Sequence, residues 1–170
     1  MKISGNSYTV AHPDLNYERS AVLFSLAALY SSLGTGESRR DGESIKKAIA
    51  AFQTSAGILH HILTELIPLI PHLFSGMNAR NSDPDLTPAM LGCLREAMLA
   101  QAQECFWQKA VVDRLKDGTI AKLAIRVSDL YSNALDFASK GITVDGKDGD
   151  DGCELPKVRV FVVEVLGGVF

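Results

Sequence analysis

The side chains best suited to chemistry in this chain are two histidines and a glutamate within one stretch of predicted helix. His61 and Glu65 are four residues apart, which places them on one face of a helix, and His60 adjoins them. Imidazole and carboxylate groups bind zinc, but zinc needs three or four ligands and the sequence supplies no further one nearby. We therefore expect no metal site and no cofactor here.

Other patterns that could support catalysis are weak. Asp83 and Asp85 flank Pro84, and this arrangement is typical of turn and helix-cap residues rather than an acid–base pair. The sequence contains no GxSxG, no HExxH, no P-loop and no GxGxxG after a predicted strand. We therefore expect that the protein is not an enzyme and has no small-molecule substrate.

Composition and charge narrow the class further. The 170 residues are 46% hydrophobic and 22% charged with a net charge of −3, which is typical of a globular protein and argues against a nucleic-acid partner. No apolar run approaches the ~18 residues of a membrane helix, and the N-terminus lacks the apolar core of a signal peptide. Three cysteines without a CxxC pair indicate a reducing, cytoplasmic environment, with Cys93 and Cys105 as small helix-packing residues.

The first predicted helix runs from about residue 15 to 33. Asp14 is its expected N-cap, and Gly34 and Gly36 are expected to end it. Its apolar residues recur at spacings of three and four, so we expect one buried face. That face comprises Val22, Leu23, Leu26, Ala27, Leu29, Tyr30 and Leu33.

The second predicted helix starts near Asp41 or Ser44 and is broken by Pro68 and Pro71, because proline cannot donate a backbone hydrogen bond. Its expected buried face comprises Ile45, Ala48, Ile49, Phe52, Ala56, Leu59, Ile62, Leu63 and Leu66.

The third and fourth predicted helices form the second half of the domain. Thr87 as N-cap followed by Pro88 marks the third helix, which we expect to reach about Lys116, where Gly118 interrupts it. Gly141 is the expected C-cap of the fourth. Its expected buried face comprises Ile120, Leu123, Ala124, Val127, Leu130, Tyr131 and Leu135. The sequence therefore predicts an all-α fold of long antiparallel helices, as in a bundle or a tetratricopeptide-like helical solenoid, although no 34-residue repeat is present.

The stretch LAQAQECFWQKAVVDRLKDGTIAKLA, residues 99–124, leaves core and surface roles open. Phe106 and Trp107 are adjacent, so the two rings cannot both face the same way. A phenylalanine at helical spacing is commonly a core residue, and the same holds for Leu123. We expect one face of this stretch to be buried and the other to be available to a partner.

The C-terminal residues differ in character from the helices. Residues 141–157 are acidic and glycine-rich, as in a loop, whereas residues 158–170 (VRVFVVEVLGGVF) are mostly apolar and rich in β-branched valine. An apolar strand without a partner at the end of a helical domain promotes aggregation. We expect residues 158–170 not to belong to the native fold.

Four segments together resemble the BRO domain family, found in Alix and in fungal PalA-type pH-response adaptors. They are YERSAVLFSLAALYSSLG, AAFQTSAGILHHI, DLTPAMLGCL and the 99–124 stretch, in family order over about residues 13–140. FWQKA and KDGTIAKLA favour the PalA-like branch. The resemblance implies that residues 1–140 are the central part of a longer, tetratricopeptide-like domain. VRVFVVEVLGGVF matches nothing in the family, so we infer that the gene is truncated or mis-spliced. A transcript that continues past Lys157 without this segment would support that inference, and one that encodes it would count against it.

The resemblance also implies a function. BRO domains are adaptors that bind the amphipathic C-terminal helix of an ESCRT-III subunit of the Snf/CHMP type, by helix-in-groove recognition. They act in endosomal multivesicular-body sorting or in ambient-pH signalling. The implied location is the cytoplasm with recruitment to endosomes, where membrane association is peripheral and through partners.

Matched residue by residue, the family's binding patch falls on Phe106, Thr119 and Leu123. Thr119 departs from the aliphatic residue found in Alix, and the apolar Ile120 beside it points about 100° away on an ideal helix. Lys116 and Lys122 are expected to meet acidic residues of the ligand at the rim. Two alternatives stay open, a generic helical-repeat scaffold that binds another peptide and a truncated fragment without function.

Overall fold

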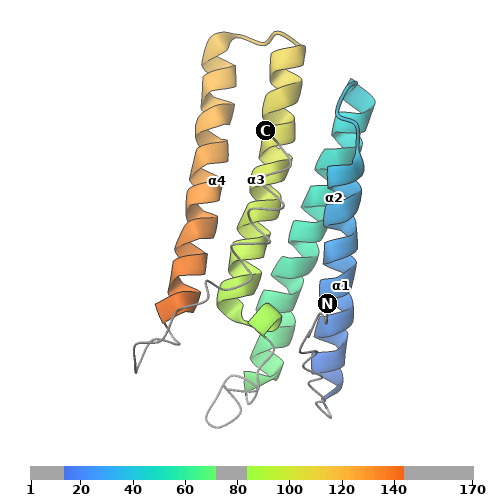
Figure 1. The fold of residues 1–170 in the computed structure, drawn as a ribbon, viewed down its shortest axis with the longest axis vertical. Helices are drawn as coiled ribbons and strands as arrows, with labels where there is room; N and C mark the ends of the chain where they lie inside the picture. The colour runs from blue at the N-terminus through green and yellow to red at the C-terminus, as the bar shows by residue number, and fades with distance from the viewer. Residues whose placement is uncertain (1–13, 72–83, 144–170) are drawn as a thin grey trace, which may run out of the picture.

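The computed structural model describes residues 14–71 and 84–143, all of which lie in helices or in the turns between them (Figure 1). The long helices are α1 (Leu15–Gly36), α2 (Gly42–His61), α3 (Pro88–Val112) and α4 (Asp117–Thr143). Two short turns follow α2: a π-helical turn at Ile62–Leu66 and a 3-10 turn at Ile67–Leu69. Another 3-10 turn, at Pro84–Leu86, precedes α3. The predicted all-α fold is confirmed, and the described ranges contain no strand.

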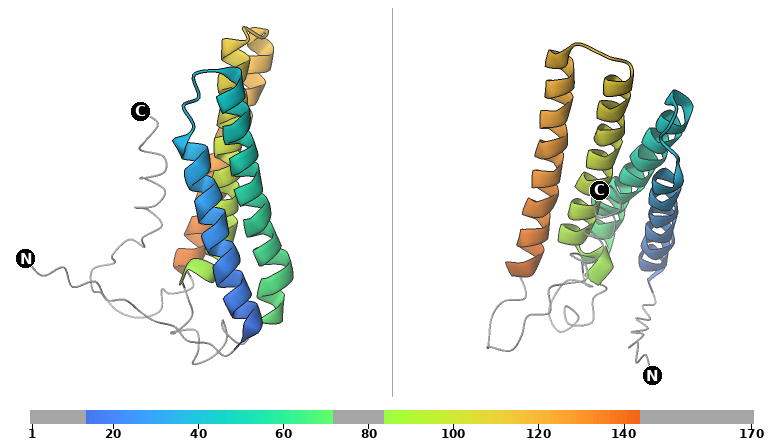
Figure 2. Two further views of the ribbon diagram at one scale, coloured as in Figure 1. Left: turned by 90° about the vertical axis from the view of Figure 1, so that its right-hand side faces the viewer. Right: turned by 45° about the horizontal axis from the view of Figure 1, so that its top comes forward.

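The helices pack side by side in chain order. α2 packs against α1 on one side and against α3 on the other, and α3 also packs along α4 (Figures 1 and 2). Consecutive long helices run in opposite directions, so the chain forms two antiparallel hairpins placed next to each other. This is the arrangement of a helical solenoid. Within residues 14–71 and 84–143, no helix is both long and apolar enough to cross a membrane.

The helix starts follow the predicted caps. The Asp14 carboxylate accepts a hydrogen bond from Asn16 N at 2.8 Å, and the Thr87 hydroxyl accepts one from Met90 N. Asp41 forms a capping box with Ser44, in which the side chain of each residue bonds the backbone of the other. Each cap satisfies backbone N–H groups that have no partner within the helix.

The predicted end of the first helix is confirmed, and that of the third was wrong. α1 ends at Gly36, one of the two glycines expected to end it, and Gly34 lies in its last turn, where a Cβ would lie 2.8 Å from Phe52 Cε1. α3 ends at Val112, four residues before the predicted end, because Arg114 adopts a left-handed conformation with φ 51°. Gly118 therefore lies inside the first turn of α4 and does not interrupt a helix.

α2 is the centre of the core. Every residue of its predicted buried face is buried except Leu63, which is half-buried. Pro68 cannot donate the next helical hydrogen bond, and the chain widens into the π-helical turn just before it. The buried Ile67 and Ile70 then pack the irregular end of the segment against the core. This prediction for the second helix is confirmed.

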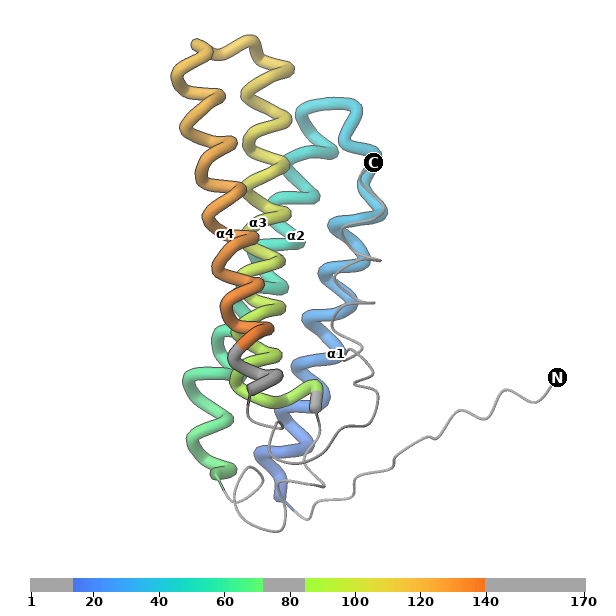
Figure 3. Tube along the Cα trace, turned by 60° about the vertical axis from the view of Figure 1, so that its left-hand side comes forward, coloured from blue at the N-terminus to red at the C-terminus, as the bar shows by residue number. Residues whose placement is uncertain are grey.

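α1 does not bury the face that its sequence pattern predicted. Of that predicted face only Ala27 is buried, and Leu23 and Tyr30 are half-buried. The residues that α1 does bury are mostly small: Tyr17, Ser20, Ala27, Ser31 and Gly34. Among the described helices α1 packs mainly against α2 (Figure 3). Its aliphatic residues Val22, Leu26, Leu29 and Leu33 are exposed.

α4 is buried along one side and exposed elsewhere. Leu130 and Ala134 are buried, whereas Ala124 and Leu135 of its predicted buried face are exposed. The helix passes through Gly141, the predicted C-cap, and ends at Thr143. The remaining residues of the predicted loop and the predicted non-native segment 158–170 lie outside the described residues.

Candidate binding surface

The residues with metal-binding potential do not form a cluster. A π-helical turn follows His61, so Glu65 is no longer one regular helical turn away from it. His60 is exposed, and its Nδ1 lies 3.5 Å from Arg95 Nη1. Among the described residues no group of three His, Cys, Asp or Glu side chains is placed to hold a metal ion.

The hairpin formed by α3 and α4 carries all of the predicted partner-binding residues. We call them the hairpin patch: Phe106 on α3, Lys116 in the turn, and Thr119, Ile120, Lys122 and Leu123 on α4. Phe106 is 40% exposed, and Ile120 and Leu123 are half-buried. Lys116, Thr119 and Lys122 are exposed. These residues thus combine partly exposed apolar side chains with exposed polar and basic ones.

A hydrogen bond fixes the register of the two helices. Tyr131 on α4 donates from its hydroxyl to Glu104 Oε2 on α3 at 3.1 Å. The helices are antiparallel, so Leu123, eight residues before Tyr131, lies level with a residue about eight positions after Glu104, which is Val112. Phe106 and Leu123 are then displaced by roughly 9 Å along the hairpin axis at ~1.5 Å per residue. That displacement is close to two turns of a ligand helix, which matches apolar residues at i and i+7.

The turn between the helices is a Schellman motif. Arg114 N donates to the Val111 carbonyl at 3.1 Å, and Leu115 N donates to the Ala110 carbonyl at 3.0 Å. Both bonds satisfy carbonyl groups at the end of α3 that have no helical partner. The turn reverses the chain in four residues and brings the start of α4 beside the end of α3 (Figure 1).

The hairpin also contains buried thiol groups and a partly buried tyrosine. Cys105 is completely buried, and burial raises the pKa of its thiol, as it does for Cys93. Burial also raises the pKa of Tyr131, which keeps its phenol protonated and able to donate to Glu104. Trp107 is half-buried, so the more exposed of the two adjacent rings is Phe106.

Sequence reasoning missed several residues around the hairpin patch. Val112 is 63% exposed and Leu115 is 46% exposed, because α3 ends earlier than predicted and leaves its tip uncovered. Arg126 is exposed one turn beyond Lys122, on the same side of α4. Neither Lys122 nor Arg126 forms an ion pair with a described residue. The surface near the hairpin turn is therefore aliphatic and basic.

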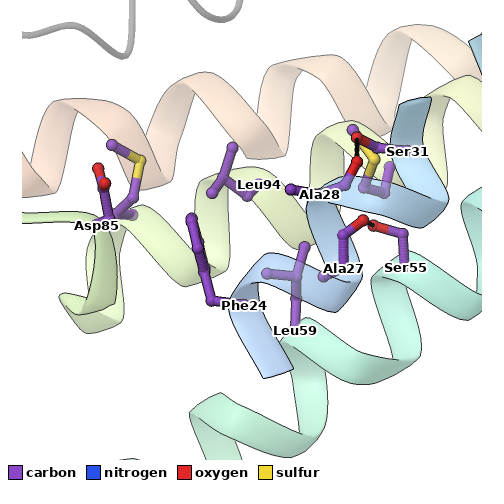
Figure 4. Close-up of a pocket in the computed structure, with 10 residues that line it drawn as sticks. Phe24, Ala27, Ala28, Ser31, Ser55, Leu59, Asp85 and Leu94 are labelled. Atoms are coloured by element: carbon purple, nitrogen blue, oxygen red, sulfur yellow. Dashed lines mark hydrogen bonds between the residues drawn. The ribbon is translucent and has the colours of Figure 1, made fainter. Parts of the chain in front are cut away.

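Apart from the hairpin patch, a pocket lies between α1, α2 and α3. It has a volume of about 270 Å³, and its lining includes Phe24, Leu59, Met90, Leu94 and Met98 (Figure 4). The two serine hydroxyls in its wall are already engaged, since Ser31 donates to the Ala28 carbonyl and Ser55 to the Ala27 carbonyl, each at 2.8 Å. This pocket is consequently apolar, except for Asp85 at one end of the lining.

The chain is thus an all-α protein of antiparallel helical hairpins. Its surface near the turn between α3 and α4 is aliphatic and basic. The family model of the BRO1-like domain matches residues 3–154, and the chain belongs to that family. The resemblance found in the sequence is thereby confirmed.

The relatives are much longer proteins. The pH-response regulator protein palA/RIM20 of Emericella nidulans is 43% identical over 135 residues, which are 79% of this chain and 15% of that protein. The Programmed cell death 6-interacting protein of Xenopus laevis is 37% identical over 134 residues, 78% of this chain and 14% of that protein. The chain thus spans about one seventh of these relatives.

A solved structure shows the same fold. The crystal structure of ALIX in complex with the SIVmac239 PYKEVTEDL late domain aligns with a TM-score of 0.67 and 28% sequence identity. The alignment covers 97% of this chain and 22% of the ALIX chain.

Proposed function

We propose that this chain is an adaptor segment whose hairpin patch binds the amphipathic C-terminal helix of an ESCRT-III subunit of the Snf/CHMP type. The observation that carries the proposal is that the exposed Phe106 and the half-buried Leu123 lie on two adjacent antiparallel helices, displaced by about two turns of a ligand helix. An apolar stripe on a ligand helix would cover both side chains and remove their apolar surface from water. Membership of the BRO1-like family supports this reading.

The charges at the rim fit a ligand with acidic flanks. Lys116, Lys122 and Arg126 are exposed, and none of them is paired with a described carboxylate. Such rim charges accelerate encounter and select orientation more than they add affinity. We propose that they orient the ligand helix along the hairpin.

The proposed cellular role is recruitment of ESCRT-III at endosomes by a cytoplasmic protein that meets the membrane through its partners. Similarity to the pH-response regulators favours ambient-pH signalling, and similarity to the Programmed cell death 6-interacting protein is compatible with endosomal sorting. Both roles use the same helix-in-groove contact.

Fluorescence anisotropy with a labelled peptide of an ESCRT-III C-terminal helix tests the proposal. Leu123→Asp should weaken binding at least about tenfold, because it introduces a charge into the apolar centre. Ile125→Asp is the matched control: it lies two residues along α4, is 62% exposed and faces about 200° away. The two variants should have the same helical content, and equal losses of affinity in both would refute the patch.

A gain of affinity tests the register at position 119. Thr119→Ile restores an aliphatic side chain, and each buried CH₂ contributes about 0.8 kcal/mol, so binding should tighten a few-fold. An unchanged Kd would place the ligand away from Thr119 and point to Ile120 as the apolar contact.

The pocket between α1, α2 and α3 favours a second candidate, a helical-repeat scaffold that binds an apolar peptide residue there. In that case Met98→Asp, and not Leu123→Asp, should abolish peptide binding. A cooperative melting transition in the wild-type chain would count against the alternative that it is a non-functional fragment.

A further inference from the structure

One residue of the hairpin patch carries a hydroxyl group in a basic stretch of sequence. Thr119 is preceded by Lys116 at three positions and by Arg114 at five positions. No other serine or threonine in the 170-residue sequence has a lysine or arginine at both of these positions. Protein kinases select substrates by such charge patterns, since acidic groups beside their active site attract basic residues that precede the acceptor. The pattern therefore indicates a phosphate acceptor for a basophilic serine/threonine kinase.

The structure leaves this segment accessible. All of residues 111–119 are exposed, and the turn between α3 and α4 forms a tip beyond the loop that joins α1 and α2 (Figures 1 and 3). The hydroxyls of Thr54 and Thr64 each donate to the carbonyl four residues earlier, at 2.8 and 3.0 Å. The Thr119 hydroxyl, in contrast, bonds no other described residue. Its modification therefore breaks no hydrogen bond within the described helices.

The reaction is a phosphoryl transfer from ATP. Thr119 Oγ1 attacks the γ-phosphorus and forms a new O–P bond, while the bond from that phosphorus to the oxygen bridging the β- and γ-phosphates breaks. ADP leaves, and the hydroxyl proton passes to the catalytic base of the kinase. The product carries about −1.5 to −2 charges on the phosphate at pH 7.

This phosphate would lie among the basic residues at the rim of the hairpin patch. Lys122 follows Thr119 by three residues and Arg126 follows it by seven, so both lie on the same side of α4 as Thr119. The phosphate would neutralise these cations and repel acidic residues of a ligand helix. Leu123, four residues after Thr119, is the apolar contact, and covering a phosphate beside it with an apolar stripe costs desolvation energy.

We propose that Thr119 is phosphorylated by a basophilic serine/threonine kinase and that the phosphate switches off ligand binding at the hairpin patch. The switch rests on the proposed function, whereas the modification itself does not. Each of the two is measured separately.

Mass mapping of the full chain after incubation with Mg-ATP and a purified kinase of this specificity tests the modification. One phosphate is expected on Thr119 and none on Ser132, which is exposed on α4 without a basic residue at either position. Arg114→Gly and Lys116→Gln should each slow the modification severalfold. Glycine also relieves the left-handed backbone at residue 114, so slower modification of Arg114→Gly does not reflect unfolding. An unmodified Thr119, or equal modification of Ser132, would overturn the proposal.

Fluorescence anisotropy with the labelled ESCRT-III helix peptide tests the switch. The phosphorylated chain should bind at least about tenfold more weakly than the unmodified chain. Thr119→Glu should also weaken binding relative to the neutral Thr119→Gln, which is its matched control, and added salt should reduce that difference. Equal affinities of the phosphorylated and unmodified chains would overturn the switch. A chain that binds no peptide in either state refutes the proposed function and the switch together, whereas the mass map still decides whether Thr119 is the acceptor.

Discussion

Gly92 sets the distance between the two helices that carry the hairpin patch, and replacing it should expand that packing. A Cβ at residue 92 would lie 2.5 Å from Phe137 Cδ1 and 2.8 Å from Cε1, closer than real Cβ contacts. The ring is held between α3 and α4 and has Arg95 above it, 5.7 Å from its centroid. Gly92→Ala must therefore move the ring or push α4 away from α3.

Two opposing effects decide the sign of the change. Alanine stabilises a helix interior by about 0.5–1 kcal/mol relative to glycine, whereas overpacking a core costs about 1–3 kcal/mol. We expect Gly92→Ala to lower the free energy of unfolding by about 0.5–2 kcal/mol. Gly57→Ala on α2 is the matched control, because its Cβ meets nothing within 4 Å, and it should stabilise by about 0.5–1 kcal/mol.

Urea unfolding followed by circular dichroism measures both variants. The m-values should stay equal, so that the midpoint shift reports stability alone. Phe137→Leu should recover part of the loss in the Gly92→Ala background, since it removes the ring that the new methyl group meets. Equal stabilisation by Gly92→Ala and Gly57→Ala would refute the close-packing argument.

Other predictions follow from single contacts. Arg114→Gly should raise the free energy of unfolding by about 0.5–1 kcal/mol, because glycine adopts the left-handed conformation without strain; a loss in urea unfolding would contradict the Schellman turn. Tyr131→Phe should cost about 1 kcal/mol by removing the hydrogen bond to Glu104, whereas Tyr30→Phe should stay within about 0.5 kcal/mol in the same assay. The backbone hydrogen bond from Ser44 holds the pKa of Asp41 below its ordinary value of 3.8. The ionised cap therefore stabilises the fold fully above pH 3.8, and this stabilisation is lost as the pH falls through the lowered pKa. Asp41→Asn should flatten this acid dependence of the thermal midpoint, and an unchanged pH profile would contradict it.

The sequence predicted the helices well because their starts and their buried faces depend on local chemistry. Asp14, Asp41 and Thr87 are side-chain caps, and a cap acts within three residues along the chain. The central helix α2 has neighbours on both sides, so its apolar residues became the core as expected.

The errors arose where the outcome depends on packing or on an unusual backbone. Nothing in the sequence marks Arg114 as the residue with φ 51°, so the end of α3 was placed near Gly118 instead. The periodicity of α1 is real, but whether an apolar stripe is buried depends on its neighbours. Leu26 and Leu29 therefore belong to the predicted core and yet face outward here.

The hairpin patch was also predicted only in part. Family resemblance located Phe106 and Leu123 on adjacent helices, and both are accessible or partly so. The exposed Val112 beside them was not predicted, because it depends on where α3 ends.

Hydrogen–deuterium exchange with and without saturating ESCRT-III helix peptide is the most direct test that the hairpin patch binds the ligand, since it locates the ligand on the chain. We expect protection in the second half of α3, in the turn at residues 113–116 and in the first two turns of α4. Protection confined to α1, or to residues lining the pocket between α1, α2 and α3, would contradict it.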